Sequence, residues 1–144
     1  MNVGGRKHCG LCAACLLRRL SLHAAGLSES GDTYVVSNLA TPELSKAFAS
    51  ISQQADRNIM VEYGSVGARH LQHLADMASL ADDALRAHVS QIATALGKSQ
   101  EEVLRHLRRM LRAHAEEWRA FLLAQGEKSF LRRWMDGGRN GGLE

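Results

Sequence analysis

Three cysteines crowd into one short stretch near the start of this chain, and they limit its fold more than any other feature. They stand at positions 9, 12 and 15 of 144 residues, and the sequence holds no others. Cys9, Cys12 and Cys15 form two overlapping C-x-x-C steps, a spacing that lets thiolates converge on one ion through a tight turn. An odd, closely packed set is a poor disulfide framework, so metal or redox chemistry in a reducing compartment is the better interpretation.

The ligand type favours zinc, because thiolates select Zn²⁺, which takes four tetrahedral ligands in structural sites. Gly10 lies inside the first step and supplies the backbone freedom that a metal knuckle needs. Three cysteines leave the set one ligand short. The candidates for the fourth are His8, His23, a water molecule or a residue of another chain. Arg18 and Arg19 follow the last cysteine and could donate to the sulfurs and stabilise their charge.

Three other interpretations of the cysteines stay open. They could be thiols that hold no metal, although their spacing argues for an ion. An iron–sulfur cluster normally takes a fourth cysteine. A redox-active C-x-x-C would be expected after a β-strand, which the preceding residues do not indicate.

The chain beyond the cysteines has the signals of α-helix from residue 41 to about residue 126. Few aromatic residues and many Ala, Leu and Arg residues favour helix over sheet. Thr41 can cap a helix whose first residue is Pro42, a position where the missing N–H has no partner to lose. The apolar residues that would then share one face are Leu44, Phe48 and Ile51.

A second pair of helix boundaries is marked at Gly97 and Ser99. Gly97 is typical of a helix end, and Ser99 with Glu102 forms a capping box. The apolar stripe before Gly97 is Leu85, Val89, Ile92 and Leu96, extended upstream by Leu71, Leu74 and Ala78. The helix after Ser99 has a predicted buried side of Leu104, Leu107, Leu111, Trp118 and Leu122. Its predicted exposed side is Arg105, Arg109, Arg112 and Arg119.

These patterns predict a mainly α protein with an N-terminal cysteine knuckle followed by a helical bundle. The expected divisions are a zinc-knuckle segment over 1–40, the bundle over 41–136 and a flexible glycine-rich tail over 137–144. One short strand is expected near Tyr34 or Val61. No run of about 18 apolar residues predicts a membrane span, and the N-terminus lacks the apolar core of a signal peptide. We therefore expect a cytoplasmic protein.

The remaining polar clusters indicate surface rather than chemistry. His70 and His73 have helical spacing, but such a pair is more typical of surface or half-buried histidines than of metal ligands. The arginines between 105 and 119 could contact phosphates, but interleaved glutamates would neutralise them through i,i+4 pairs. We expect a solvated, salt-bridged face there and no nucleic-acid partner. No nucleophile, base and acid can be grouped, so no catalytic residue is assigned.

A longer run around the cysteines matches a known motif. It reads Gly4-Gly5-Arg6-Lys7-His8-Cys9-Gly10-x-Cys12-x-x-Cys15-x-x-Arg18-Arg19, then His23-Ala24-Ala25-Gly26-Leu27, then Asp32-Thr33-Tyr34. This run, about a quarter of the chain, resembles the 7-cyano-7-deazaguanine synthase family, which usually places one more residue before the tyrosine. In that family the segment closes an ATP-pyrophosphatase fold and holds a structural zinc on four cysteines, spaced C-x7-C-x2-C-x2-C. The resemblance makes Cys9, Cys12 and Cys15 the last three ligands and places the first at Met1.

The resemblance also implies an activity that this sequence does not complete. The family forms the nitrile of 7-deazaguanine biosynthesis by adenylating a carboxylic acid with ATP and adding ammonia. It uses an S-G-G-x-D-S loop to hold the ATP phosphates, and that loop is not in this sequence. We therefore expect the zinc-binding C-terminal portion of such an α/β protein, inactive alone. Another chain could supply the nucleotide domain or the fourth ligand, and ATP would bind only in the complete enzyme.

The helical part after residue 41 is longer than we expect after the zinc segment of the ordinary biosynthetic enzyme. Relatives of this family in bacterial defence systems are one candidate source of such an extension, on architecture rather than on a motif. Two alternatives stay open. One is a stand-alone helical protein-interaction module that keeps a zinc knuckle. The other is a nucleic-acid-binding knuckle that uses Arg6, Lys7, Arg18 and Arg19.

Overall fold

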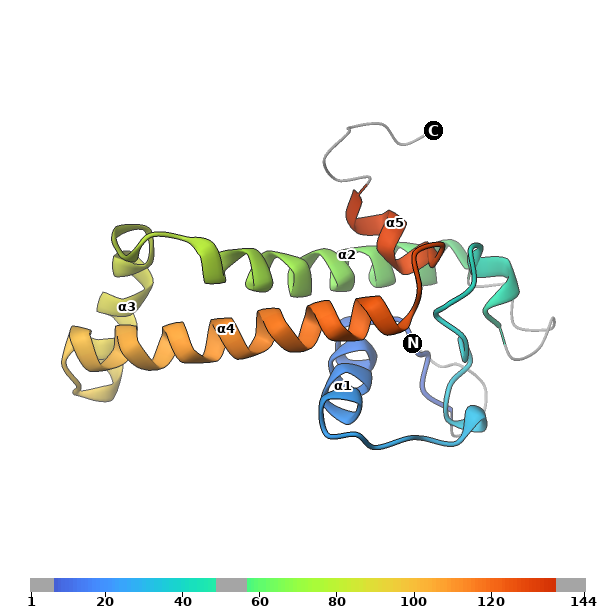
Figure 1. Cartoon of the computed structure of the whole chain (residues 1–144), viewed down its shortest axis with the longest axis horizontal. Helices are drawn as coiled ribbons and strands as arrows, with labels where there is room; N and C mark the ends of the chain where they lie inside the picture. The colour runs from blue at the N-terminus through green and yellow to red at the C-terminus, as the bar shows by residue number, and fades with distance from the viewer. Residues whose placement is uncertain (1–6, 49–56, 137–144) are drawn as a thin grey trace.

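A computed structural model describes residues 7–48 and 57–136, and over these ranges the protein is mainly helical, as predicted (Figure 1). The α-helices are α1 (Ala13–Ala24), α2 (Arg57–Asp76), α3 (Asp82–Leu96), α4 (Gln100–Ala124) and α5 (Phe130–Asp136). Short 3₁₀ turns occupy Gly31–Thr33, Leu44–Lys46 and Met77–Ser79. The predicted tail 137–144 lies outside the described residues.

The two longest helices set the shape of the molecule. α2 and α4 run antiparallel along the long axis, and α3 connects them at one end (Figure 1). At the other end α1 packs against both α2 and α4, and α5 packs on α2. Among the described helices, none combines the length and the apolar character that a bilayer crossing requires.

The helix boundaries with the strongest local signals are where the sequence predicts them. Gly97 ends α3 with a φ of 62°, in the left-handed region that a residue without Cβ adopts most easily. Ser99 caps α4, because its side chain accepts a hydrogen bond of 3.2 Å from the backbone N–H of Glu102.

The helix predicted from Thr41 is wrong over the described part of that segment. Residues 44–46 form a single 3₁₀ turn, and Phe48 instead pairs with Val36 in an isolated antiparallel bridge. The Thr41 hydroxyl donates 3.0 Å to the carbonyl of Glu43, so it competes with helix formation rather than capping a helix. Ile51 lies outside the described residues.

The strand expected near Tyr34 is present only as isolated bridges within the described residues. Tyr34 pairs in parallel with His8, and Val36 pairs with Phe48. Val61, the other expected position, lies within α2. The Tyr34–Val36 run is nevertheless buried, because it lies under the cysteine loop.

The larger of two apolar cores joins the cysteine segment to the helices. Its members come from the N-terminal loop, from α1 and from the ends of α2, α4 and α5 that lie together. They include Cys9, Leu11, Cys15, Leu16, Leu20, Val35, Met60, Leu71, Trp118, Phe121, Phe130 and Leu131. The cysteines therefore lie in the same core as the large aromatic residues of α4 and α5.

A smaller core lies between α3 and the first half of α4. It consists of Leu85, Val89, Ala93, Val103 and Leu111. The stripe predicted for α3 is only partly right, because Ile92 and Leu96 are 38% and 61% exposed and Ala93 takes their place inside. α3 packs mainly on α4, so no other helix in the described part of the chain covers the exposed face of the stripe.

The apolar residues predicted upstream and along α4 are also only partly buried. Leu71 is buried, Leu74 is 40% exposed and Ala78 is half-buried. On α4, Leu111 and Trp118 are fully buried, whereas Leu104, Leu107 and Leu122 are half-buried.

The α4 arginines predicted to be exposed are exposed, but the predicted salt bridges are not formed there. Within the described residues, no carboxylate oxygen lies within 4.0 Å of Arg105, Arg109, Arg112 or Arg119. Glu102 pairs instead with Lys98 at 2.5 Å. Glu116 follows Arg112 by four residues, the order of charges that contributes least along a helix.

A buried serine links the segment after α1 to the start of α5. The Ser129 hydroxyl donates 2.6 Å to the carbonyl of Leu39 and accepts 3.1 Å from the backbone N–H of Leu131. Next to it, the N–H of Phe130 donates 2.9 Å to the carbonyl of Thr41. The segment that follows the cysteines is thereby fixed to the start of α5.

Candidate metal centre

The loop before α1 and the first turn of α1 bring the three cysteine sulfurs together. The Sγ atoms of Cys9, Cys12 and Cys15 all lie within 4.8 Å of one another, and those of Cys9 and Cys15 are 3.5 Å apart. Tetrahedral zinc with bonds of about 2.3 Å holds two sulfurs about 3.8 Å apart. The three side chains could therefore hold a metal ion after small adjustments.

Backbone geometry at Gly10 makes the turn possible. Gly10 has a φ of 88°, and a Cβ there would lie 2.4 Å from the carbonyl oxygen of Val36. Two hydrogen bonds hold the loop against this segment: Val35 N–H to His8 O at 2.9 Å and Val36 N–H to Cys9 O at 3.1 Å. Only a residue without a side chain fits in this position.

The helix then positions the other two sulfurs. Cys12 is the N-cap residue of α1, and Cys15 lies in its first turn. α2 fixes this end of α1, because a Cβ at Gly67 would lie 2.9 Å from the backbone nitrogen of Ala13. Gly67 was not predicted as a site residue, although an isolated glycine inside a helical pattern is a signal of close approach.

The cluster is built to carry negative charge. The sulfurs of Cys9 and Cys15 share a hydrogen bond of 3.5 Å, and this bond is the main cause that lowers the pKa of Cys9. The backbone N–H of Cys12 adds a hydrogen bond of 3.3 Å to the same sulfur. The same thiol–thiolate contact raises the pKa of Cys15. Without a metal the two sulfurs thus share a proton, and a bound ion would replace it.

The two arginines make contacts other than the predicted donation to the sulfurs. Arg18 donates from both Nε (2.9 Å) and Nη2 (2.7 Å) to one carboxylate oxygen of Glu29. Arg19 Nη2 donates to the carbonyls of Val36 (2.5 Å) and Ser37 (3.3 Å). Through these two hydrogen bonds Arg19 holds the 36–37 segment, which lies against the cysteine loop.

An aromatic ring and a carboxylate complete this support. The Arg19 guanidinium lies 3.8 Å from the centroid of the Tyr34 ring, and the Tyr34 hydroxyl donates to Glu29. That hydrogen bond, and then Arg18, lower the pKa of Glu29. Burial lowers the pKa of Arg19, and the nearby Tyr34, Cys15 and Glu29 partly offset it. Glu29 was missed from the sequence because no spacing rule links it to the cysteines.

Neither histidine proposed as the fourth ligand joins the three sulfurs. Among the described residues, the metal-type group contains only the cysteines. His8 is exposed, with its ring centroid 6.1 Å from that of Tyr34, and His23 packs edge-on against Phe121 at 5.6 Å. His70 and His73 are exposed on α2 and lie outside this group. Met1, where the resemblance places a ligand, lies outside the described residues.

The cluster is thus a set of three converging thiols, two of them buried, joined to the main core and braced by Arg19. Comparison with known proteins adds no relative to this description: no protein-family model, no curated protein and no solved structure matches the chain.

Proposed function

We propose that Cys9, Cys12 and Cys15 hold a structural zinc ion that fixes the N-terminal segment to the helical bundle. The observation that carries the proposal is the convergence of three sulfurs within 4.8 Å. All-thiolate donor sets favour zinc, and a bound ion would stabilise the folded chain by its binding free energy. Only reduced cysteines can bind the ion, so the site suits a reducing compartment such as the cytoplasm, where thiols stay reduced.

We further propose that the chain corresponds to the zinc-binding C-terminal portion of a 7-cyano-7-deazaguanine synthase-like protein. Support comes from the cysteine spacing and from the packing of three residues that carry the resemblance. A Cβ at Gly10 would lie 3.2 Å from both Arg19 Nη2 and Tyr34 Cβ. Because the S-G-G-x-D-S loop is not in this sequence, ATP binding and nitrile formation would need a nucleotide domain from elsewhere.

A second candidate, the helical interaction module, is favoured by one other feature. An apolar hollow of about 480 Å³ lies between α3 and α4. Its lining includes the exposed side chains Ile92, Leu96 and Met110. Exposed apolar side chains that gather in a groove between helices are typical of helix-binding surfaces. This candidate keeps the zinc ion but needs no nucleotide domain.

Cobalt(II) titration tests the metal site. Because the three cysteines are the only ones in the chain, a thiolate-to-cobalt charge-transfer band reports this cluster alone. We expect the band to saturate at about one ion per chain and zinc to displace the cobalt. Cys9→Ser and Cys15→Ser should each weaken it, whereas Ser21→Ala, on the exposed side of α1, should not. A wild-type protein without the band would contradict the proposal.

The family assignment has a separate test, so that it can fail while the metal site stands. An in-frame coding sequence upstream of Met1 that contains an S-G-G-x-D-S loop would support it. A stop codon directly upstream, with no neighbouring chain that carries such a loop, would contradict it and favour the interaction module.

A further inference from the structure

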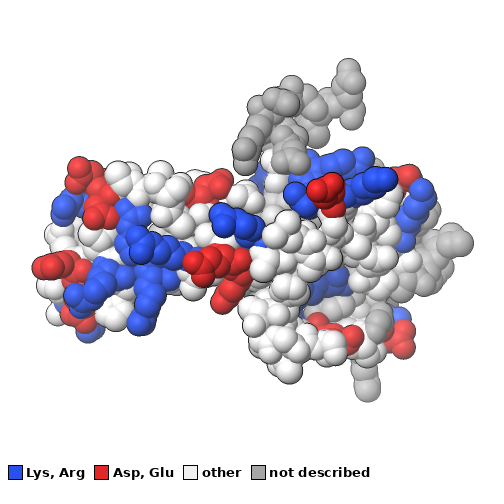
Figure 2. Space-filling model, in the orientation of Figure 1, with Lys and Arg blue, Asp and Glu red and all other residues white. Residues whose placement is uncertain are grey.

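A group of arginines lines an open hollow on α4, far from the cysteines. Figure 2 shows them as a basic patch over the first half of the helix, with acidic residues on either side. The hollow has a volume of about 670 Å³. The arginines in its lining are Arg105, Arg108, Arg109 and Arg112. The other three follow Arg105 by three, four and seven residues, so all four lie on one side of the helix.

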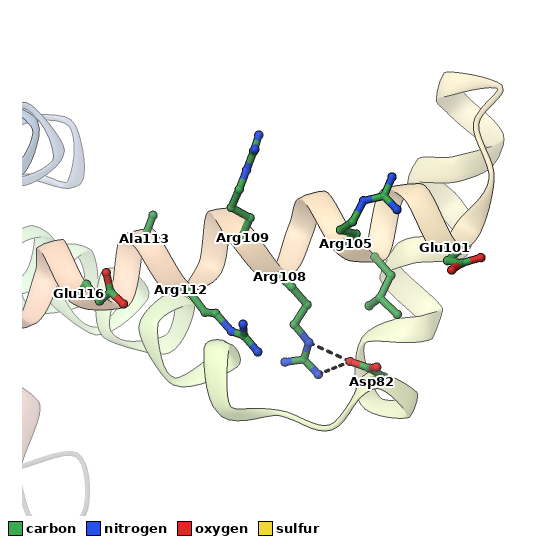
Figure 3. A pocket seen from close by; sticks show the side chains of 9 residues that line it. Asp82, Glu101, Arg105, Arg108, Arg109, Arg112, Ala113 and Glu116 are labelled. Atoms are coloured by element: carbon green, nitrogen blue, oxygen red, sulfur yellow. Dashed lines mark hydrogen bonds and ion pairs between the residues drawn. The ribbon is translucent and has the colours of Figure 1, made fainter.

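Only one of these four guanidinium groups is neutralised within the described residues. Arg108 donates to Asp82 through Nε at 2.8 Å and Nη2 at 2.5 Å (Figure 3). Arg105, Arg109 and Arg112 have no carboxylate within ion-pair distance in the described ranges. The acidic residues Glu101 and Glu116 line the two ends of the hollow, so the free positive charge is concentrated at its centre.

Contrary to the expectation from the sequence, the glutamates do not pair with Arg105, Arg109 or Arg112 in the described ranges. We therefore propose that this arginine groove binds the phosphate backbone of a nucleic-acid duplex. A guanidinium group presents paired N–H donors that match phosphate oxygens, and it stays charged at any physiological pH. From Arg105 to Arg112 the helix rises about 10 Å. A duplex carries about one charge per 1.7 Å of axis, so a duplex that crosses this stretch of α4 can still present about two or three phosphates to it.

The lining of the groove favours nucleic acid over an acidic protein. Protein partners bind through buried apolar anchors, but among the described residues the aliphatic side chains in this lining are only Leu104 and Ala113. Leu104 is itself half-buried against the α3–α4 core. Backbone phosphates need charged donors and no such anchor. A second copy of the chain would bring the same positive charges face to face.

The same lining favours a duplex over a single strand. Single strands gain affinity from aromatic side chains that stack on bases, and none of the described residues that line this groove is aromatic. The flanking Glu101 and Glu116 would repel a polyanion that ran along α4. The duplex therefore crosses the helix, and the contact is limited to about two or three phosphates.

Fluorescence anisotropy with a labelled duplex of about 20 base pairs tests the proposal on the zinc-loaded chain, over about 50 to 200 mM salt. The logarithm of the association constant should fall against the logarithm of salt concentration with a slope of about −2 to −3. Arg109→Gln and Arg112→Gln should each weaken binding and reduce the size of the slope by about 1. Arg119→Gln is the matched control, because Arg119 is exposed on the same helix but does not line the groove.

Circular dichroism of each variant establishes that these exposed substitutions leave the helices intact. The proposal is overturned if the wild-type chain shows no salt-dependent binding to duplex DNA or duplex RNA. It is equally overturned if Arg119→Gln loses as much affinity as Arg109→Gln. Tighter binding of polyglutamate than of the duplex would assign the groove to an acidic protein instead. Tighter binding of a single strand than of the duplex would contradict the choice of a duplex as the ligand.

Discussion

Gly67 of α2 and Ala13, the first residue of α1, lie so close that a Cβ at position 67 would come within 2.9 Å of the Ala13 backbone nitrogen. Ala13 directly follows Cys12, so this contact sets where the first turn of α1 presents its sulfurs. The geometry of the cysteine cluster therefore depends on a helix that begins more than forty residues later in the sequence.

Gly67→Ala is expected to destabilise the protein even though alanine favours helix by about 1 kcal/mol. The backbone of Ala13 cannot move away without shifting α1, so we expect a net loss of about 1–3 kcal/mol in the free energy of unfolding, together with weaker cobalt binding. Urea unfolding and cobalt titration measure the two effects.

Gly64→Ala is the matched control for that experiment. Its closest neighbours would all be side-chain atoms: two ring atoms of the half-buried Trp134, at 2.9 Å and 3.1 Å, and Leu11 Cβ at 3.2 Å. Side chains can shift more easily than the backbone that Gly67 meets, so we expect the smaller effect at Gly64. A Gly67→Ala protein that is as stable as Gly64→Ala and binds cobalt like the wild type would contradict the role given to this contact.

Gly10→Ala is expected to abolish tight metal binding. Gly10 and Gly26 both have positive φ values, 88° and 66°, so alanine at either position costs about 1–2 kcal/mol in backbone strain. At Gly26 a Cβ meets nothing within 4 Å, whereas at Gly10 it would meet the Val36 carbonyl at 2.4 Å. Only Gly10→Ala should therefore disturb the cobalt spectrum. Equal spectra for the two variants would show that the loop does not need this close approach.

Signals that lie within a few residues of one another predicted this fold well. The Gly97–Ser99 boundary depends on local backbone geometry, and the C-x-x-C spacing alone brings the three cysteines together, so the sequence identifies both. The close contacts of Gly67 with Ala13 and of Gly10 with Val36, which fix the cluster in the core, are not local and were not predicted. The helix predicted from Thr41 does not form because the Thr41 hydroxyl bonds the Glu43 carbonyl and Phe48 pairs with Val36, twelve residues earlier. Tertiary contacts of this kind leave no periodic mark in the sequence.

The exposed part of the α3 stripe shows a second limit. A period of 3.6 residues identifies the apolar side of α3, but it cannot say whether another helix covers Ile92 and Leu96. The same holds for Arg18 and Arg19, whose partners Glu29 and Val36 are set by how the 29–37 segment folds back over α1.

Trp118→Ala is expected to be among the most damaging substitutions. Trp118 is 1% exposed, its ring lies 5.6 Å from that of Phe121, and its indole N–H donates 3.0 Å to Gln72. Truncation of a large buried aromatic side chain costs about 3–5 kcal/mol. Met110→Ala, on the same helix but at a 56% exposed position, should change the free energy of unfolding by less than about 0.5 kcal/mol. Similar losses in urea unfolding would argue against the proposed core.

Glu29→Gln is expected to reduce the dependence of stability on acidic pH. Because hydrogen bonds from Tyr34 and then Arg18 lower the pKa of folded Glu29, its contribution is present above the unfolded pKa and is lost as pH falls through the folded pKa. The wild type should therefore lose more stability than Glu29→Gln between about pH 5 and pH 3. Thermal unfolding across this range measures the difference.

Glu127→Gln serves as the control for that series, since Glu127 is exposed in the turn between α4 and α5. Acid also protonates metal-binding thiolates, but this loss is common to all three proteins. Parallel pH profiles for the wild type and Glu29→Gln would show that the Tyr34–Glu29–Arg18 contacts do not hold the 29–34 segment in place.

X-ray absorption at the zinc edge of the zinc-loaded protein tests the central claim most directly, because it reads the atoms around the ion. Three cysteine ligands predict a shell dominated by about three sulfur neighbours near 2.3 Å, with at most one lighter atom. A shell composed only of nitrogen and oxygen neighbours at about 2.0–2.1 Å would place the ion elsewhere in the chain and contradict the account.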